Sequence, residues 1–301
     1  MQPDVAPRSD TLAKLAGTAR ERRRTGVWQR FRRHRLALIG LAILLLLTVG
    51  AIAAPLIAWH GPYEVNLSET RSEPSSTYIL GTDAAGRDIF SRVLHAGRVS
   101  LSVGLVAVGI YTIIGVVLGA LGGFYGGWVD SFIMRMADVV LAFPNLIIII
   151  TVVSVLGPGL FNLMLVIGLL GWPPITRLLR GEFLSLRERE FIVAARATGA
   201  GNNRLMFRHL LPNAMAPIIV AATFGVANAI LLEAGLSFLG LGVQPPQPSW
   251  GNMLTDAQSL TVLESMPWLW IPPGIFIALA VLSINFIGDG LRDALDPYLS
   301  R

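Results

Sequence analysis

Residue types that carry enzyme chemistry are sparse in this chain and are not arranged in the patterns that catalysis requires. Cysteine is absent, and the histidines are too scattered to suggest a metal cluster; they are His34, His60, His95 and His209. Neither H-E-x-x-H nor G-x-S-x-G occurs, so neither a zinc protease nor a serine hydrolase is predicted. The only lysine, Lys14, does not follow a glycine run, which excludes a P-loop. The sequence therefore predicts no catalytic residue, no metal site and no cofactor bound by this chain.

An ionisable side chain inside a long apolar stretch is the next kind of candidate, because a charge in hydrocarbon is costly and marks a solute or ion pathway. Glu233 is the one serious case. Counted from Asn213 at about 1.5 Å per residue, Glu233 lies about 30 Å along its helix, near one surface and not at the midplane. We therefore expect Glu233 to make a structural hydrogen bond, and we retain it as a candidate pathway residue.

The composition indicates the class of protein. Hydrophobic residues make up 53% of the 301 residues and charged residues 14%, against roughly 25% charged in soluble domains. The mean hydropathy is +0.61, so the chain would not stay solvated as an open coil. We therefore predict an all-α, polytopic integral membrane protein.

Six apolar stretches are long enough to cross about 30 Å of hydrocarbon as helices. The first is 36–59, and the other five lie within a core, 99–290. The sequence Gly-Pro-Gly at 157–159 predicts a tight turn between the third and fourth spans. Arg135 and Asp138, near the inner end of the third span, are expected to form an interfacial pair. Glycines recur every four residues in the second span and predict close approach of a neighbouring helix; they are Gly115, Gly119 and Gly123.

The basic residues predict the orientation. Ten Lys and Arg precede residue 36 and seven lie in 177–208, whereas four lie in 60–98. Since cytoplasmic loops carry the excess of Lys and Arg, both termini are predicted to be cytoplasmic. These residues then face anionic lipid headgroups, and no nucleic-acid partner is expected. The predicted organisation is a cytoplasmic Arg-rich tail (1–35), a first span (36–59), an extracytoplasmic segment with an interfacial helix (60–98), a five-helix core (99–290) that includes a cytoplasmic loop (177–212), and a cytoplasmic C-terminal tail (291–301).

Two extracytoplasmic segments carry candidate contact residues. Charges at i, i+4 spacing and an apolar set predict an interfacial helix over 83–98. The stretch 244–248 has three prolines in five residues, so it is expected to be stiff and extended. The segment 83–98 either contacts an external protein or only anchors the bundle, and the stretch 244–248 is expected to present a fixed surface to the same external protein. The candidate contacts are Asp83, Arg87, Asp88, Arg92, Gln244, Pro245, Pro246 and Trp250.

The cytoplasmic loop 177–212 contains a second amphipathic pattern. Gly199 stands where a helix C-cap belongs. Asn202 or Asn203 is expected to cap a second short helix, after which Pro212 fits the first turn of the fifth span. From this pattern alone, the element either occupies a groove in another protein or lies on the membrane surface. Small or apolar residues form one face of its first helix, at Phe191, Ala194, Ala195 and Thr198.

This loop resembles the EAA motif of permease subunits in ATP-binding-cassette importers, E-A-A-x-x-x-G followed by nine residues and I-x-L-P. It departs at Val193, where the family often has Glu, and at His209, where an aliphatic residue is usual. Three further segments, 80–92, 236–251 and 288–297, look like the dipeptide, oligopeptide and nickel permeases, in particular their second, "C"-type membrane subunit. The motif matches at Ala194, Ala195, Gly199, Leu211 and Pro212.

The resemblance implies a type I importer permease fold in the cytoplasmic membrane of a bacterium or archaeon. It implies import of peptides or a peptide-like small solute by alternating access, with ATP and Mg bound by partner chains, so that this chain is not itself an enzyme. The implied partners are a "B"-type permease, two ATPase subunits and an extracytoplasmic substrate-binding protein. The residues that would couple to the ATPase are Glu190, Ala194, Ala195, Arg196, Gly199, Ala200, Leu211 and Pro212.

Two other classes of membrane protein remain as alternatives. An ion-coupled secondary transporter would need discontinuous helices and ionisable groups near the midplane, of which this sequence has almost none. An intramembrane hydrolase would need paired acids, or a serine facing a histidine, inside the bilayer, and the candidates here are isolated. Copurification separates these classes, because only an importer subunit is expected to bind an ATPase and a sibling permease.

Overall fold

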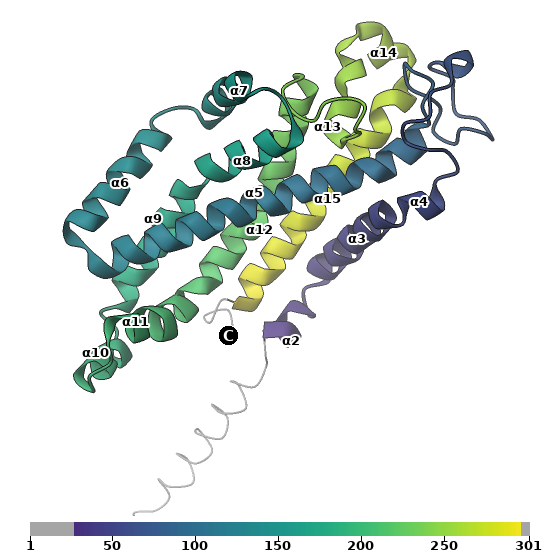
Figure 1. Ribbon diagram of the computed structural model, residues 1–301. Helices are drawn as coiled ribbons and strands as arrows, with labels where there is room; N and C mark the ends of the chain where they lie inside the picture. The colour runs from purple at the N-terminus through teal and green to yellow at the C-terminus, as the bar shows by residue number, and fades with distance from the viewer. Residues whose placement is uncertain (1–26, 296–301) are drawn as a thin grey trace, which may run out of the picture.

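The computed structural model describes residues 27–295, and within that range it is helical without strands. Residues 1–26 and 296–301 lie outside the description, so most of the predicted Arg-rich tail and the last part of the C-terminal tail are not placed. Figure 1 shows long helices packed side by side, with shorter helices at both ends of the bundle. The predicted all-α class is confirmed.

The described elements, in chain order, are α2 (Val27–Phe31), α3 (Arg35–Ile52), α4 (Ala54–Ile57), the 3-10 turn η1 (Leu67–Glu69), α5 (Ile89–Tyr125), α6 (Gly127–Leu141), α7 (Asn145–Leu156), α8 (Leu160–Leu170), α9 (Trp172–Leu186), α10 (Glu190–Ala197), α11 (Asn202–Arg204), the π-helical turn η2 (Leu205–Leu210), α12 (Leu211–Phe238), α13 (Trp250–Met253), the 3-10 turn η3 (Thr255–Gln258), α14 (Leu260–Ser265) and α15 (Pro267–Leu295).

Five helical stretches within the described range are long and apolar enough to cross a bilayer. Two shorter helices, α6 and α7, pass the same test only as a pair, and they are bent by 82° at the break between them. Taken as one broken span, this pair completes the six spans that the sequence predicts. The five stretches are Arg35–Ile52, Ile89–Tyr125, Leu160–Leu186, Asn202–Phe238 and Pro267–Leu295.

The third span differs most from the prediction. The expected turn at 157–159 is present, with Gly157 at φ +89°. A second break, which the sequence analysis does not anticipate, separates α6 from α7 at 142–144. Pro144 accounts for it, because proline has no N–H to donate and disfavours helical geometry at the preceding Phe143. The third span is therefore two helices that point in different directions.

Helix α5 crosses the bundle diagonally (Figure 1). Its 37 residues extend about 55 Å at about 1.5 Å per residue, so one end projects beyond about 30 Å of hydrocarbon. The glycine stripe packs against α9: a Cβ at Gly123 would lie 2.6 Å from Phe183 Cβ, and one at Gly119 would lie 2.8 Å from Thr176 O. Both distances are shorter than side chains tolerate. The predicted close approach is thus confirmed, with α9 as the neighbour.

Two apolar clusters hold the bundle and its ends together. The larger one joins α5, α8, α9 and α12 and continues to Ile192 and Leu205, beyond the end of α9. The smaller one lies between α5, α13 and α15, around Trp250. On the other side of the bundle, α3 packs along α15. The short elements at both ends are therefore attached to the bundle by buried side chains.

Helix α5 begins later than the predicted interfacial helix. It starts at Ile89, whereas the prediction places helix from residue 83. Residues 82–88 instead form a tight turn, in which Gly86 has φ +72° and a Cβ would lie 1.8 Å from Asn66 O. A positive φ is incompatible with a right-handed helix, so the charged residues of this turn precede the helix.

Candidate functional site

The basic loop, residues 187–210, projects from one end of the bundle and carries α10, α11 and η2 (Figure 1). Helix α10 forms where the sequence predicts a helix. Ile192 is 1% exposed and fixes this helix to the larger apolar cluster, whereas the neighbouring Phe191 is 46% exposed. Ala194 is exposed and Ala195 is half-buried. Helix α10 is thus anchored by one buried side chain and exposes a face of small and apolar residues.

Helix α10 ends in a Schellman cap. Ala200 N donates to Ala195 O at 3.1 Å, and Gly199 N donates to Arg196 O at 3.0 Å. Gly199 has φ +82°, and no atom lies within 4 Å of the position that a Cβ would take. The predicted glycine cap is confirmed, and glycine is required there for its backbone conformation and not for space.

The second half of the basic loop differs from the prediction at its start. Gly201 is the N-cap of α11, and neither Asn202 nor Asn203 caps it; both lie inside the first turn. The chain then continues through η2 directly into α12, where Pro212 occupies the first turn as expected. Leu205 is 1% exposed, so this half is also anchored in the core.

Two ion pairs connect α6 to α9 close to the basic loop. Arg180 donates from Nε and Nη2 to the two carboxylate oxygens of Asp130, and Arg177 Nη2 lies 2.5 Å from Asp138 Oδ1. The prediction that Asp138 pairs with Arg135 is wrong, because α9 runs beside α6 and brings Arg177 to this carboxylate. These pairs connect the broken third span to the helix that precedes the basic loop.

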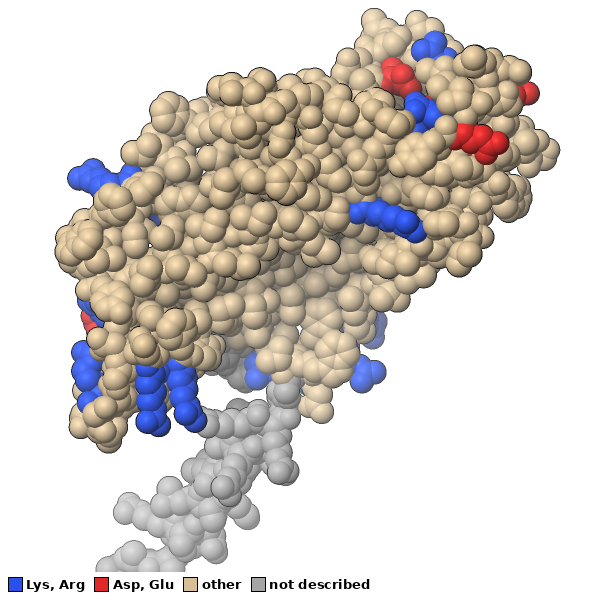
Figure 2. Space-filling model, in the orientation of Figure 1, with Lys and Arg blue, Asp and Glu red and all other residues tan. Residues whose placement is uncertain are grey.

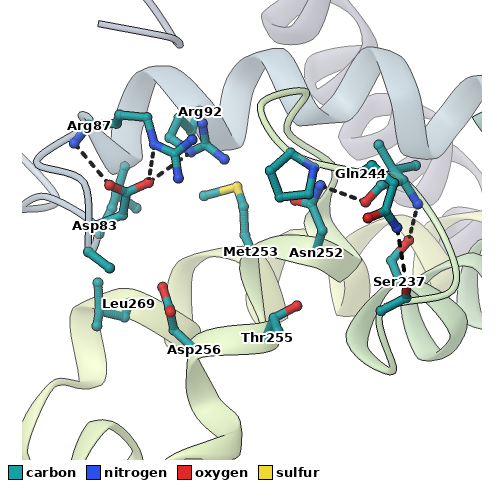
Figure 3. Close-up of a pocket in the computed structure, with 15 residues that line it drawn as sticks. Asp83, Arg87, Arg92, Ser237, Gln244, Asn252, Met253, Thr255, Asp256 and Leu269 are labelled. Atoms are coloured by element: carbon teal, nitrogen blue, oxygen red, sulfur yellow. Dashed lines mark hydrogen bonds and ion pairs between the residues drawn. The ribbon is translucent and has the colours of Figure 1, made fainter. Parts of the chain in front are cut away.

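The opposite end of the bundle contains a cavity of about 240 Å³, which we call the charged pocket (Figure 3). Asp83 is the centre of its polar wall: its Oδ2 accepts from Arg87 Nε at 2.7 Å and lies 3.3 Å from Arg92 Nε. Asp83 Oδ1 accepts from the backbone N–H groups of Ala85 and Arg87. Arg92 also donates to Pro62 O at 3.0 Å. One carboxylate therefore closes the turn and pairs with two guanidinium groups.

Asp88 has a different role from the one predicted. The spacing suggests an Asp88–Arg92 pair, but Arg92 pairs with Asp83, because Asp88 precedes the helix and caps it. Its two carboxylate oxygens accept from Phe90 N and Ser91 N, both at 3.2 Å. Burial raises the pKa of Asp88, and these two hydrogen bonds oppose the increase by favouring the carboxylate.

Asp256, in η3, lies across the charged pocket from Asp83 and Arg87 (Figure 3). Burial raises its pKa most, and the nearby carboxylate of Asp83 raises it further, whereas Arg71, Arg87 and Arg92 lower it. No hydrogen bond or ion pair holds the Asp256 carboxylate within the described residues. The sequence analysis does not identify this acid, because the turn that brings η3 to the start of α5 has no local signal.

Burial divides the predicted contact residues into two groups. Asp83, Asp88, Arg92 and Trp250 are 7%, 3%, 4% and 1% exposed. Trp250 Nε1 donates to Val93 O at 3.0 Å inside the smaller cluster. The expectation that Trp250 lies at the surface is therefore wrong. The residues that remain accessible for contact are the half-buried Arg87 and the exposed Gln244, Pro245 and Pro246.

Glu233 is 0% exposed and makes the structural hydrogen bonds that we expect for it. Ser100 Oγ and Ser237 Oγ donate to its two carboxylate oxygens at 2.9 and 2.7 Å. Trp250 N in turn donates to Ser100 Oγ at 3.1 Å. Glu233 thus joins α5, α12 and α13, and its carboxylate is enclosed by donors and not open to a pathway.

A second cavity, of about 290 Å³, lies between α5, the α6–α7 break, the α8–α9 junction and α12. We call it the central cavity. Its polar groups are Tyr111, Asn145 and Asn228, and no acidic or basic side chain lines it. The sequence analysis does not identify these residues, because a lone asparagine in an apolar stretch gives no sign of what it faces.

Most charged side chains on the face shown in Figure 2 lie toward the two ends of the described chain. On the face shown in Figure 2, arginine side chains project from the end with the basic loop, and the acidic side chains lie mostly toward the opposite end. A wide, nearly uncharged band separates the two ends, as a bilayer requires.

Comparison with known proteins assigns this arrangement. Residues 115–301 match the family described as binding-protein-dependent transport system inner membrane component. The chain belongs to this family. Residues 25–74 also match the N-terminal transmembrane domain of oligopeptide transport permease C. The protein is thus a membrane permease component of a binding-protein-dependent transport system, which is a transport subunit and not an enzyme.

Several relatives of this permease align over most of its length. A putative peptide permease protein of Brucella suis is 48% identical over 268 residues, 89% of each chain. The dipeptide transport system permease protein DppC of Alkalihalophilus pseudofirmus is 46% identical over 272 residues, 90% of this chain and 89% of the relative. The oligopeptide transport system permease protein OppC of Bacillus subtilis is 41% identical over 272 residues, 90% and 88%. The recognition of a "C"-type permease is confirmed.

Proposed function

We propose that this permease imports peptides or a peptide-like small solute, and that ATP hydrolysis in two partner ATPase subunits drives the import. The solute class rests on the relatives, whose names specify peptide, dipeptide and oligopeptide transport. The coupling rests on one observation: the basic loop presents the exposed, small-residue face of α10 on anchors that are buried in the bundle. An anchored helix can transmit the motion of a partner to the bundle as a rigid element.

The charge distribution supports an orientation with both termini in the cytoplasm. Arg187, Arg189, Arg196, Arg204 and Arg208 are exposed in the basic loop and make no ion pair within the described residues. Such an excess of arginine is typical of the cytoplasmic side. This orientation places the charged pocket outside the cell, where Arg87, Gln244, Pro245 and Pro246 are the accessible candidates for contact with a substrate-binding protein.

The proposed mechanism is alternating access. ATP draws the ATPase subunits together, and α10 moves with the ATPase groove in which it lies. This chain and a sibling permease then open outward to receive the solute. Hydrolysis returns both permeases to the inward-open state. Such coupling requires that nucleotide and binding protein both favour the same one of two global states.

Two glycines of the basic loop provide the test. Gly199→Val places a β-branched residue at φ +82°, whereas Gly201→Val places it at φ −67°, and both positions have open space around the added side chain. The left-handed conformation costs roughly 1–2 kcal/mol for a residue with a Cβ, so only Gly199→Val is expected to deform the cap. We expect Gly199→Val to lose ATP-driven peptide uptake in proteoliposomes that contain the whole complex, while Gly201→Val retains it.

The same preparation separates the alternatives. Normal ATPase copurification and normal uptake by Gly199→Val would contradict the coupling role of α10. Uptake that follows an ion gradient and needs no ATP would instead favour an ion-coupled secondary transporter.

A further inference from the structure

The central cavity contains polar groups at a depth where lipid cannot satisfy them. Asn228 is 17 residues into α12, about 25 Å from its first residue, and Tyr111 lies 14 residues before the end of α5. Asn228 and Asn145 are both exposed, and their side-chain amides have no hydrogen-bond partner among residues 27–295. An amide without a partner is costly in hydrocarbon, so this face of the bundle meets something other than lipid tails.

The backbone at the same cavity leads independently to the same conclusion. Residues 142–144 interrupt the third span, and the helices on either side diverge by 82°. Irregular backbone at membrane depth is tolerated only where it is buried in protein or lines a water-filled cavity. Phe143 and Pro144 are exposed on this chain, so the break is not buried within it.

The floor of the cavity is held by close packing. Tyr111 is 9% exposed, and a Cβ at Gly225 would lie 1.7 Å from its hydroxyl oxygen, while one at Gly171 would lie 2.6 Å from its ring. These contacts hold the tyrosine between α12 and the α8–α9 junction. The Tyr111 hydroxyl therefore belongs to a packed part of the cavity that Asn145 and Asn228 also line.

We propose that the central cavity is this chain's part of the solute pathway, and that Asn145 and Asn228 donate to and accept from the main-chain amide groups of a passing peptide. The proposal rests on the function proposed above and adds residues to it. Side-chain amides match peptide N–H and C=O groups in any sequence. Because no acidic or basic residue lines the wall, peptides of either charge pass without selection there.

Cysteine accessibility tests whether the cavity holds water, and the natural chain has no cysteine that would interfere. Asn228→Cys and Asn145→Cys are expected to react with a membrane-impermeant, charged thiol reagent in the assembled complex, in at least one nucleotide state. Leu231→Cys is the matched control: Leu231 is on the same helix and 47% exposed but does not line the cavity, so it is expected to remain unlabelled. Protection of both asparagine positions in every nucleotide state would overturn the proposal, whatever the solute is.

Charge preference tests contact with the solute. Asn228→Asp is expected to raise the ratio of cationic to anionic peptide uptake about 25-fold over the natural complex, because one charge about 4 Å away in water favours the cation about fivefold and disfavours the anion about fivefold. Because the variant is compared with the natural complex, any charge selection by the binding protein affects both ratios equally. Asn285→Asp, the same change on α15 outside the cavity, is expected to leave the ratio unchanged.

The outcomes separate the possible failures. If Asn228→Asp does not assemble, Asn145→Asp serves instead, because an acid at the first residue of α7 is favourable there. An unchanged ratio in the assembled variants would overturn the proposal, and so would loss of the sibling permease from both asparagine variants, since the amides would then belong to an interface. Absence of ATP-driven peptide uptake by the natural complex would instead refute the proposed function, while the cysteine labelling still decides whether the cavity is a water-filled path.

Discussion

The two ends of the molecule differ in how their charged side chains are buried and paired. In the charged pocket, Asp83 is buried, and its carboxylate is shared by Arg87 and Arg92. In the basic loop, by contrast, the arginines are exposed and make no ion pair within the described residues, while apolar anchors such as Ile192 are buried. The comparison indicates that buried charges hold the pocket in one shape, whereas the loop keeps its charges and small residues available to a partner.

The largest expected effect comes from breaking the buried pairs. Asp83→Ala leaves two guanidinium groups without their carboxylate and removes the acceptor that closes the 82–88 turn. Losing one partner of a buried pair costs about 3–5 kcal/mol, so we expect a marked fall in the thermal unfolding midpoint of the purified protein in detergent. Glu188→Ala, an exposed acid of the basic loop, is the control and is expected to change stability by less than about 0.5 kcal/mol. Equal midpoints for the two variants would remove the contrast between the ends.

A matched pair of glycines sharpens the comparison. Gly86 and Gly199 have nearly the same φ, +72° and +82°, but a Cβ meets Asn66 O at 1.8 Å in the first case and nothing within 4 Å in the second. Gly199→Ala is therefore expected to cost only the backbone strain, about 1–2 kcal/mol. Gly86→Ala adds a steric overlap and is expected to cost about 1–3 kcal/mol more. Thermal unfolding of both variants under the same conditions measures the difference, and a Gly199→Ala loss as large as that of Gly86→Ala would mean that the loop is packed as tightly as the pocket.

The smallest expected effect on stability comes from the exposed face of α10. Phe191 is 46% exposed, so Phe191→Ala is expected to change the free energy of unfolding by less than about 0.5 kcal/mol. Copurification with the ATPase subunits is nevertheless expected to fall, because a large apolar contact would be lost from the docking face. Ile192→Ala is the reference for a buried anchor in the same helix, with an expected loss of about 2–5 kcal/mol. Full retention of the ATPase by Phe191→Ala would argue against this face as the contact.

Sequence reasoning was most successful where one segment determines its own structure. The apolar spans, the cap at Gly199 and the place of Pro212 follow from local periodicity and from the conformations of glycine and proline. It was less successful where distant segments meet. Asp138 pairs with Arg177 on another helix, and Trp250 is buried against Val93. Spacing along one helix cannot predict such contacts, because the partner lies on a different helix, and a nearby residue such as Arg135 offers an equally reasonable local pairing.

The glycine stripe of α5 shows the boundary between local and tertiary information. The four-residue spacing predicts that some helix approaches closely, but only the packed bundle identifies α9 as that helix. Pro144 shows the same limit. Its effect on the backbone is local and general, but the angle of 82° between α6 and α7 is known only from the folded chain.

The sequence by itself determined that this protein lies in a membrane, that its fold is all-α and to which family it belongs, because hydropathy, helix signals and short motifs are properties of contiguous residues. Tertiary structure alone decided which charges are buried in pairs, that Glu233 is enclosed by serines, and that Asn145 and Asn228 line one cavity. The physical reason is that burial and partnership are set by helices distant in sequence, and the free energy of a polar group in a membrane depends on what those helices place beside it.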